Sequence, residues 1–353
     1  MQREKVMGPP VVAVFNHKGG VAKTTTACNL AVCLAAHGLR VVLIDLDAQG
    51  NATGSFGILP LPPVGAYDVL TGAVGLEEAL VDTRFPGLKL LPATVRLRTA
   101  ELDLGVAERS HAHLRDRLLE HGLDRFADVA VVDCPPSLGT MTSNALAAAA
   151  AVLIPARPDP FTHEGLVNTW YEVKRLREKA NASLSVAGIL LTMTDADDTA
   201  ADVARTMRAE FGDQVYGVEI ASDPKVGESV QLAVPVSVLD PDGLAGRAYF
   251  DAAEELLRRL ARQNRPETRL PATDTRDGAL NTLRDWRAGQ LALRRLPTGA
   301  RGWTAVEKAN PDTTPEAPRV EPRRRAGWGP AVLGFGLGVA AGLAAPYLAA
   351  LLR

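Results

Sequence analysis

The chain contains few cysteines and few aromatic residues for its length. Of its 353 residues only 3 are Cys, and aromatic residues make up 5%. Cys28, Cys33 and Cys134 are too few and too dispersed for a disulfide framework or a cysteine-bound iron–sulfur cluster. We also find no secretion signal before the first apolar segment. These absences exclude a small disulfide-stabilised domain and favour a protein of the reducing cytoplasm.

The chain also lacks a large excess of either charge, with a net charge of −2. The charge is unevenly distributed. Residues 263–325 contain 13 Lys and Arg against 8 acidic residues, so residues 1–262 carry a net charge of about −8. A domain of that charge does not attract DNA over its whole surface. Binding to nucleic acid would therefore need a local basic patch.

A short apolar segment, a glycine-containing loop and a helical segment follow one another near the N-terminus. Residues 11–15 form an apolar run typical of a buried parallel strand, and residues 24–37 have a helical pattern that ends before Gly38. In such a loop the backbone N–H groups and the helix N-terminus converge on one point, which suits a polyanion. The segment therefore predicts a triphosphate-binding loop, Lys18-Gly19-Gly20-Val21-Ala22-Lys23-Thr24-Thr25.

This loop departs from the common pattern G-x-x-x-x-G-K-[ST] at both glycines, which are His17 and Ala22 here. If the backbone at Ala22 needs a positive φ, an alanine there is strained. The remaining residues fit a nucleotide. We expect Lys23 to reach the β- and γ-phosphates, the Thr24 hydroxyl to bind Mg²⁺, and Thr25 to bind the α-phosphate.

Acidic residues end two further apolar segments. Residues 41–47 end in Asp45 and Asp47, and residues 128–133 end in Asp133. In an open parallel sheet, ligands bind outside the carboxyl ends of the strands. Alternation along a strand predicts that Asp45 and Asp47 lie on the same side of it. There Asp45 would contact the hydrated Mg²⁺ ion, and Asp47 would orient the attacking water. Asp133 suits an outer-sphere contact to Mg²⁺.

The motifs K-G-G-V-x-K-T-T, D-L-D-x-Q-G-N and D-x-P-P together resemble those of the ParA/Soj family of chromosome and plasmid partition ATPases. Later blocks extend the resemblance over roughly residues 8–262. It implies a P-loop NTPase fold, and the alternation of apolar strands with helical stretches predicts the same class: α/β, a doubly wound, mostly parallel sheet flanked by helices. The cofactors that the resemblance implies are ATP and Mg²⁺.

The resemblance also implies an ATP-dependent homodimer with slow hydrolysis that a ParB-like partner stimulates. Lys18 matches the signature lysine, which crosses the dimer interface to the partner's nucleotide, while Lys23 acts in its own subunit. Asp47 matches the acid that hydrolysis needs, and Asp45 is its companion. A lysine supplied by the second subunit would couple hydrolysis to association.

Two positions depart from the family pattern. Asp223 stands where relatives have an asparagine that helps to hold the adenine, and Ser222 stands where they have an arginine that helps to bind DNA. Lys225 keeps a basic group. A patch of Arg205, Arg208 and Lys225 would grip phosphates without reading bases, or these are ordinary solvated side chains.

The sequence predicts three regions: an ATPase domain at 8–262, a proline- and arginine-rich linker at 263–325, and an apolar helix at 326–353. Within the linker, residues 278–296 fit an amphipathic helix that either docks on the ATPase domain or lies on an anionic surface.

The C-terminal region is free of charge from 326 to 352 and follows three arginines. Residues 331–352 would span about 33 Å as a helix, enough to cross a bilayer. A membrane anchor with the ATPase domain on the cytoplasmic side of the inner membrane is expected; a hydrophobic tail and a partner-docking helix are the alternatives. The tail also keeps open a MinD-like positioning ATPase, a membrane scaffold without DNA binding.

Overall fold

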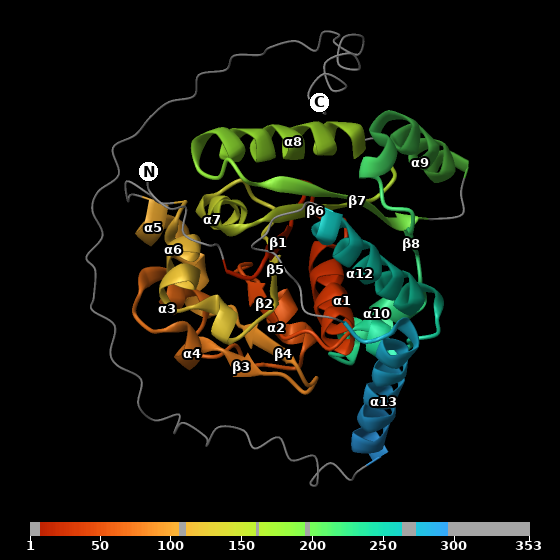
Figure 1. Cartoon of the computed structure of the whole chain (residues 1–353), viewed down its shortest axis with the longest axis horizontal. Helices are drawn as coiled ribbons and strands as arrows, with labels where there is room; N and C mark the ends of the chain where they lie inside the picture. The colour runs from red at the N-terminus through yellow and green to blue at the C-terminus, as the bar shows by residue number, and fades with distance from the viewer. Residues whose placement is uncertain (1–7, 106–110, 160–161, 195–197, 263–272, 296–353) are drawn as a thin grey trace, which may run out of the picture. The chain divides into compact units, whose positions relative to one another are not determined.

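The fold is built on one eight-stranded sheet. The computed structural model of the chain describes residues 8–105, 111–159, 162–194, 198–262 and 273–295 (Figure 1). The strand order is β3-β4-β2-β5-β1-β6-β7-β8, and all neighbouring pairs are parallel except β3 with β4. The strands are β1 (Val11–Val14), β2 (Val41–Asp45), β3 (Val81–Asp82), β4 (Leu88–Leu91), β5 (Val129–Asp133), β6 (Ala151–Ala156), β7 (Ser185–Thr194) and β8 (Ile220–Ala221).

Helices flank this sheet in two packing groups. One group contains α1, α2, α11 and α12, and the other contains α3, α5, α6, α7 and α8 (Figure 1). The doubly wound, mostly parallel α/β fold is thereby confirmed. The helices are α1 (Lys23–Ala36), α2 (Asn51–Ser55), α3 (Ala66–Thr71), α4 (Leu76–Ala79), α5 (Ala100–Gly105), α6 (His113–Glu120), α7 (Thr140–Ala148), α8 (Thr162–Lys179), α9 (Asp198–Phe211), α10 (Pro224–Gln231), α11 (Val236–Leu239), α12 (Leu244–Arg262) and α13 (Arg276–Arg295).

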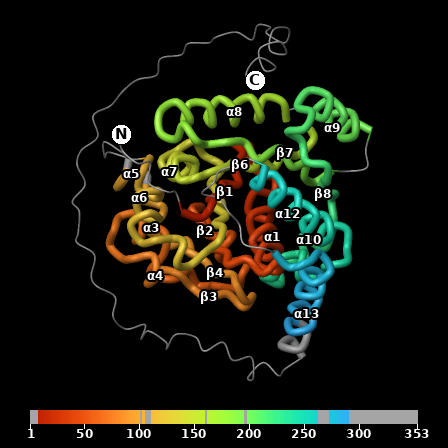
Figure 2. Tube along the Cα trace, in the orientation of Figure 1, coloured from red at the N-terminus to blue at the C-terminus, as the bar shows by residue number. Residues whose placement is uncertain are grey.

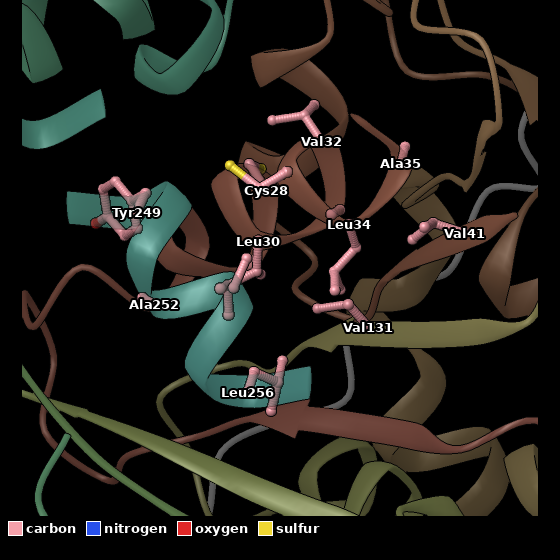
Figure 3. Packing of buried hydrophobic residues seen from close by; sticks show 14 of the residues in the cluster. Cys28, Leu30, Val32, Leu34, Ala35, Val41, Val131, Tyr249, Ala252 and Leu256 are labelled. Atoms are coloured by element: carbon pink, nitrogen blue, oxygen red, sulfur yellow. The ribbon is translucent and has the colours of Figure 1, made fainter. Parts of the chain in front are cut away.

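Helix α1 forms the centre of the core because its sequence is apolar on nearly every side. It packs beside α12, which lies more than 200 positions later in the chain (Figure 2). In Figure 3 its side chains, such as Leu30 and Leu34, lie between Tyr249 of α12 and Val131 of β5. Burial on all sides fixes the helix, and with it the loop that precedes its first turn.

Helix α13 docks on the core of the predicted ATPase domain. Of the two alternatives for residues 278–296, docking on this domain is therefore the one observed, rather than a helix that lies on an anionic surface. Ala279, Leu280 and Leu283 are buried in the main hydrophobic cluster, and Trp286 packs against it. The described residues up to Ala292, including most of α13, belong to one compact unit. The helix begins two residues earlier than expected, at Arg276.

The expected apolar helix at 326–353 and most of the expected linker at 263–325 lie outside the described residues. None of the helices in the described ranges is both long enough and apolar enough to cross a membrane.

Candidate nucleotide-binding site

Three central strands bring the predicted residues to one edge of the sheet. Strand β5 lies between β1 and β2, and the register pairs Asp133 with Val14 on one side and with Asp45 on the other. Neighbouring strands are about 4.8 Å apart, so the two carboxyl groups leave the sheet almost side by side. The loop after β1 begins at the same edge. Asp45, Asp133 and the predicted phosphate-binding loop therefore share one site.

The loop takes two left-handed backbone conformations. Gly20 has φ 70°, and Ala22 has φ 59° and ψ 31° directly before α1. The expected strain at Ala22 is confirmed; it costs about 1 kcal/mol relative to glycine. The carbonyl of the buried Val21 accepts a hydrogen bond from Thr192 of β7, 3.1 Å away. A Cβ placed on Gly19 or Gly20 would meet nothing within 4 Å, so the loop borders open space of the kind a phosphate needs.

Lys23 points back into this loop. Its side chain is buried, and its Nζ donates a hydrogen bond to the Lys18 carbonyl at 2.8 Å. Burial lowers the pKa of Lys23, and the nearby Asp133 carboxyl partly opposes that shift. Thr24 and Thr25 are half-buried in the first turn of α1. The ammonium and both hydroxyls are placed for an anion above the loop.

Lys18 is held by a different part of the chain. Its Nζ forms an ion pair with Asp159, which directly precedes the region of α8, and its backbone N–H donates to Asn16 Oδ1 at 3.0 Å. The side chains of Lys18 and Asp159 are 27% and 26% exposed. An ion pair of such partial exposure contributes about 1 kcal/mol or less, so Lys18 can leave Asp159 at little cost.

Asp45 is buried and satisfied by hydrogen bonds. Its Oδ2 accepts from the Thr53 N–H (2.8 Å) and hydroxyl (2.7 Å), and its Oδ1 accepts from the Asp47 N–H (3.1 Å). Burial raises the pKa of Asp45 to about 6, and these hydrogen bonds limit the rise. Thr53, in α2, therefore fixes the orientation of this carboxyl group.

The expectation that alternation places Asp45 and Asp47 on one side of a strand is wrong. Strand β2 ends at Asp45, and Asp47 lies in the following loop, where its Oδ1 accepts from the Gln49 N–H at 2.9 Å. Asp47 is half-buried rather than buried. It nevertheless lies near the site, because its charge affects the pKa values of Asp45, Asp133 and Lys23.

Asp133 is fully buried, and neither of its carboxylate oxygens has a hydrogen-bond partner within the described ranges. Burial and the neighbouring Asp45 raise the pKa of Asp133 well above its ordinary value; the Thr24 hydroxyl lowers it in part. An unpartnered buried carboxyl group facing a threonine hydroxyl fits a hydrated Mg²⁺ ion. The described residues contain no group of three or more His, Cys, Asp or Glu that could hold a metal, so such an ion would need water and phosphate ligands.

Asp223, the residue expected near the adenine, has a structural contact of its own. It is the N-cap of α10: Oδ1 accepts from the Lys225 N–H at 2.8 Å, and Oδ2 accepts from the Ala245 N–H at 3.0 Å. The cap joins the start of α10 to the start of α12. Its expected adenine contact stays a prediction.

The three basic residues expected to bind DNA each form an ion pair at the surface of the chain. Arg205 and Arg208 lie on α9, and Lys225 lies on α10. Ion pairs this exposed are weak, so they leave the three side chains able to exchange their acidic partners for a phosphate. The partners are Asp202 for Arg205, Glu219 for Arg208 and Glu228 for Lys225.

Two residues of the site were not predicted from the sequence. Thr53 holds Asp45, and Asp159 holds Lys18. Thr53 follows the D-L-D-x-Q-G-N motif by only two positions, which is a usable signal. Asp159 lies far from every motif, and only the fold brings it to Lys18.

The fold and the site together define a P-loop nucleotide-binding protein. A family model described as "AAA domain" matches residues 10–186. The chromosome partitioning protein ParA of Caulobacter vibrioides is 39% identical over 251 residues, which cover 70% of this chain and 94% of that protein. Soj of Bacillus subtilis, a sporulation initiation inhibitor, is 35% identical over 248 residues, 70% of this chain and 97% of that protein. The chain belongs to the ParA/Soj family of P-loop ATPases.

Solved structures share the fold of this chain. A Mycobacterium smegmatis protein described as cobyrinic acid a,c-diamide synthase, with bound ADP and magnesium, is 32% identical with a TM-score of 0.63. The match covers 76% of this chain and 99% of that chain. Cyanothece McdA in complex with ATP is 22% identical with a TM-score of 0.63, and the match covers 70% of this chain and 96% of McdA. At 22% identity, the similarity to McdA concerns the fold alone.

Replacing Asp133 with Asn is expected to stabilise the nucleotide-free protein by about 1–3 kcal/mol, because it removes a buried, unpartnered charge beside Asp45. A carboxyl group whose pKa is raised by folding makes the protein less stable as the pH rises and the group ionises. The stabilisation by Asp133→Asn should therefore grow with pH. Thermal unfolding in EDTA between about pH 5 and pH 8 measures it.

The matched control is Asp128→Asn at the opposite end of the same strand. Partial burial raises the pKa of Asp128, but hydrogen bonds from the Arg40 guanidinium lower it overall, so this substitution should destabilise the protein. Equal effects of the two substitutions would contradict the account of Asp133.

Proposed function

We propose that this chain is a partition-type ATPase that binds and hydrolyses ATP with Mg²⁺ as a dimer and uses this cycle to segregate or position DNA or another cargo. The observation that carries the proposal is the loop with two lysines above Asp45 and Asp133, in a member of the ParA/Soj family. Two relatives are named for chromosome partitioning or sporulation control. ADP or an ATP analogue, each with magnesium, is bound in solved structures of a similar chain from Mycobacterium smegmatis.

In the proposed mechanism, the N–H groups of residues 19–25 and the Lys23 ammonium bind the phosphates. Lys23 gives up its hydrogen bond to the Lys18 carbonyl and takes a phosphate oxygen instead. Thr24, Asp45 and Asp133 would hold the hydrated Mg²⁺, which would neutralise charge on the phosphates. Asp45, fixed by Thr53, holds the Asp47 N–H, and Asp47 orients the attacking water.

Lys18 is proposed to act on the nucleotide of the partner subunit. To do so it must leave Asp159, and the exposure of that pair makes this step inexpensive. Because the site needs Lys18 of a second subunit, a single subunit would hydrolyse ATP slowly. A ParB-like protein is the proposed activator.

The second candidate is a MinD-like scaffold that keeps ATP-dependent association without DNA binding. Ser222, at the position where relatives have an arginine that helps to bind DNA, favours this candidate. The acidic charge of residues 1–262 favours it too. In both candidates the ATPase domain is proposed to be cytoplasmic, with residues 326–353 anchoring it to the inner membrane.

Lys18→Ala is expected to bind ATP normally but to remain monomeric with ATP and Mg²⁺, since the lysine contacts only the partner's nucleotide. Lys23→Ala is the control and should weaken ATP binding at least about tenfold, because a charge-assisted phosphate contact is lost. Light scattering after size exclusion, paired with nucleotide titration, measures both. A Lys18→Ala protein that dimerises like the wild type would refute the proposed role.

Nonspecific DNA binding separates the two candidates. A chain ending at Arg325 is expected to bind duplex DNA at low salt only with ATP and Mg²⁺, and to lose that binding as salt rises. Fluorescence anisotropy with labelled duplex measures it. No binding at low salt would favour the scaffold instead.

Liposome flotation tests the anchor. Full-length protein is expected to float with liposomes, whereas the chain ending at Arg325 stays at the bottom of the gradient. If both behave alike, residues 326–353 do not anchor the protein.

A further inference from the structure

Helix α13 follows the residues that carry the nucleotide site and packs on the same core. Leu280 and Leu283 are buried in the main hydrophobic cluster, which also contains residues of α1 and α12. The helix is therefore in a position to affect the elements that hold the site.

Two sets of contacts hold α13, and the outer set only anchors it. Arg276 forms ion pairs with Asp251 and Glu254 of α12. Arg284 forms an exposed ion pair with Asp242 at 2.6 Å, in the loop before α12. These ion pairs join α13 to α12 and to the loop before it.

The inner set leads to the nucleotide site through aromatic rings. The Trp286 ring lies 5.3 Å from the Phe85 ring, which meets the Phe56 ring edge-on at 5.9 Å. Phe56 ends α2, and its N–H donates to the Thr53 carbonyl at 3.2 Å. Thr53 in turn gives two hydrogen bonds to Asp45. Ring contacts, one backbone hydrogen bond and the Thr53 side chain thus connect α13 to a carboxyl group of the site.

Arg84 forms a second connection between the same elements. Its Nη1 donates to Gln290 Oε1 of α13 at 2.9 Å, and its Nη2 donates to the Phe56 carbonyl at 3.1 Å. The same nitrogen also donates to the Ala233 carbonyl. Ala233 follows α10, the helix that Asp223 caps. One guanidinium group therefore links α13 to both α2 and the end of α10.

We propose that Trp286 and Gln290 are positioning residues for the nucleotide site. Through Phe85, Arg84 and Phe56 they fix α2, and α2 fixes the orientation of Asp45 through Thr53. The inference rests on the proposed binding of Mg²⁺ and ATP. Because coupling between two sites is reciprocal, binding of the nucleotide with Mg²⁺ should in turn stabilise the docked α13.

The test uses the full chain and four variants. Trp286→Ala removes the ring that packs on Phe85, and Gln290→Ala removes only the hydrogen bond to Arg84. Trp286→Phe keeps an aromatic ring and serves as the conservative rescue. Arg284→Gln is the matched control, because it loosens α13 at its outer contact without touching the inner set.

Trp286→Ala and Gln290→Ala should raise the Mg²⁺ concentration for half-maximal ATP binding by about two- to tenfold. Binding of ADP without Mg²⁺ should stay at the wild-type level. Hydrogen exchange of residues 51–58 should quicken in the nucleotide-free protein. Trp286→Phe and Arg284→Gln should resemble the wild type in all three measurements.

A Trp286→Ala protein with a lower melting temperature but unchanged Mg²⁺ dependence and exchange would overturn the proposal, and α13 would then only stabilise the fold. If Trp286→Ala does not fold, Gln290→Ala decides the question by the same measurements. Failure of the wild type to bind any nucleotide would reject the proposed function. In that case, faster hydrogen exchange of residues 51–58 in the Trp286→Ala and Gln290→Ala proteins would still show that α13 stabilises α2.

Discussion

The site depends on one constraint, the close approach of two carboxyl groups, Asp45 and Asp133, in a buried region without water contact. The pairing of β2 with β5 puts Asp45 and Asp133 at the same level of the sheet, and both are buried. Like charges so close in a low-dielectric region repel strongly. The protein relieves this repulsion unequally. Asp45 receives three hydrogen bonds, whereas Asp133 receives none within the described ranges, as the proposed Mg²⁺ site requires.

The other parts of the site follow from that imbalance. Lys23 is the nearest cation, but burial makes its charge costly, and it rests on the Lys18 carbonyl. A polyphosphate with Mg²⁺ would satisfy the lysine and the carboxyl groups together. These buried charges are therefore not fully compensated by other described residues, which favours a ligand that carries both phosphate and a cation. Lys18 takes no part in this balance, since its own carboxylate partner is Asp159.

The sequence was sufficient for the fold class, the loop and the strand-end acids, because each is encoded by a local pattern. Apolar runs set the strands, and the strand edge sets the place of Asp45 and Asp133. The sequence did not predict the position of Asp47. This residue lies in the loop after β2, and its place depends on the path that the chain takes after the strand ends. The partners Thr53 and Asp159 and the docked side of α13 also come from tertiary packing. A helical pattern cannot tell whether Leu280 and Leu283 meet a core or another surface.

The burial of α1 on all sides has a consequence for how the loop moves. A helix with one face in water can bend or rotate toward the solvent when its first turn is pulled. Helix α1 has the sheet behind it and α12 in front, and its twelve buried residues leave it almost no free direction. A displacement of the loop along the helix axis therefore has to reach the far end of α1 almost undiminished. There the helix meets Asp274, whose N–H donates to the His37 carbonyl just before α13 begins.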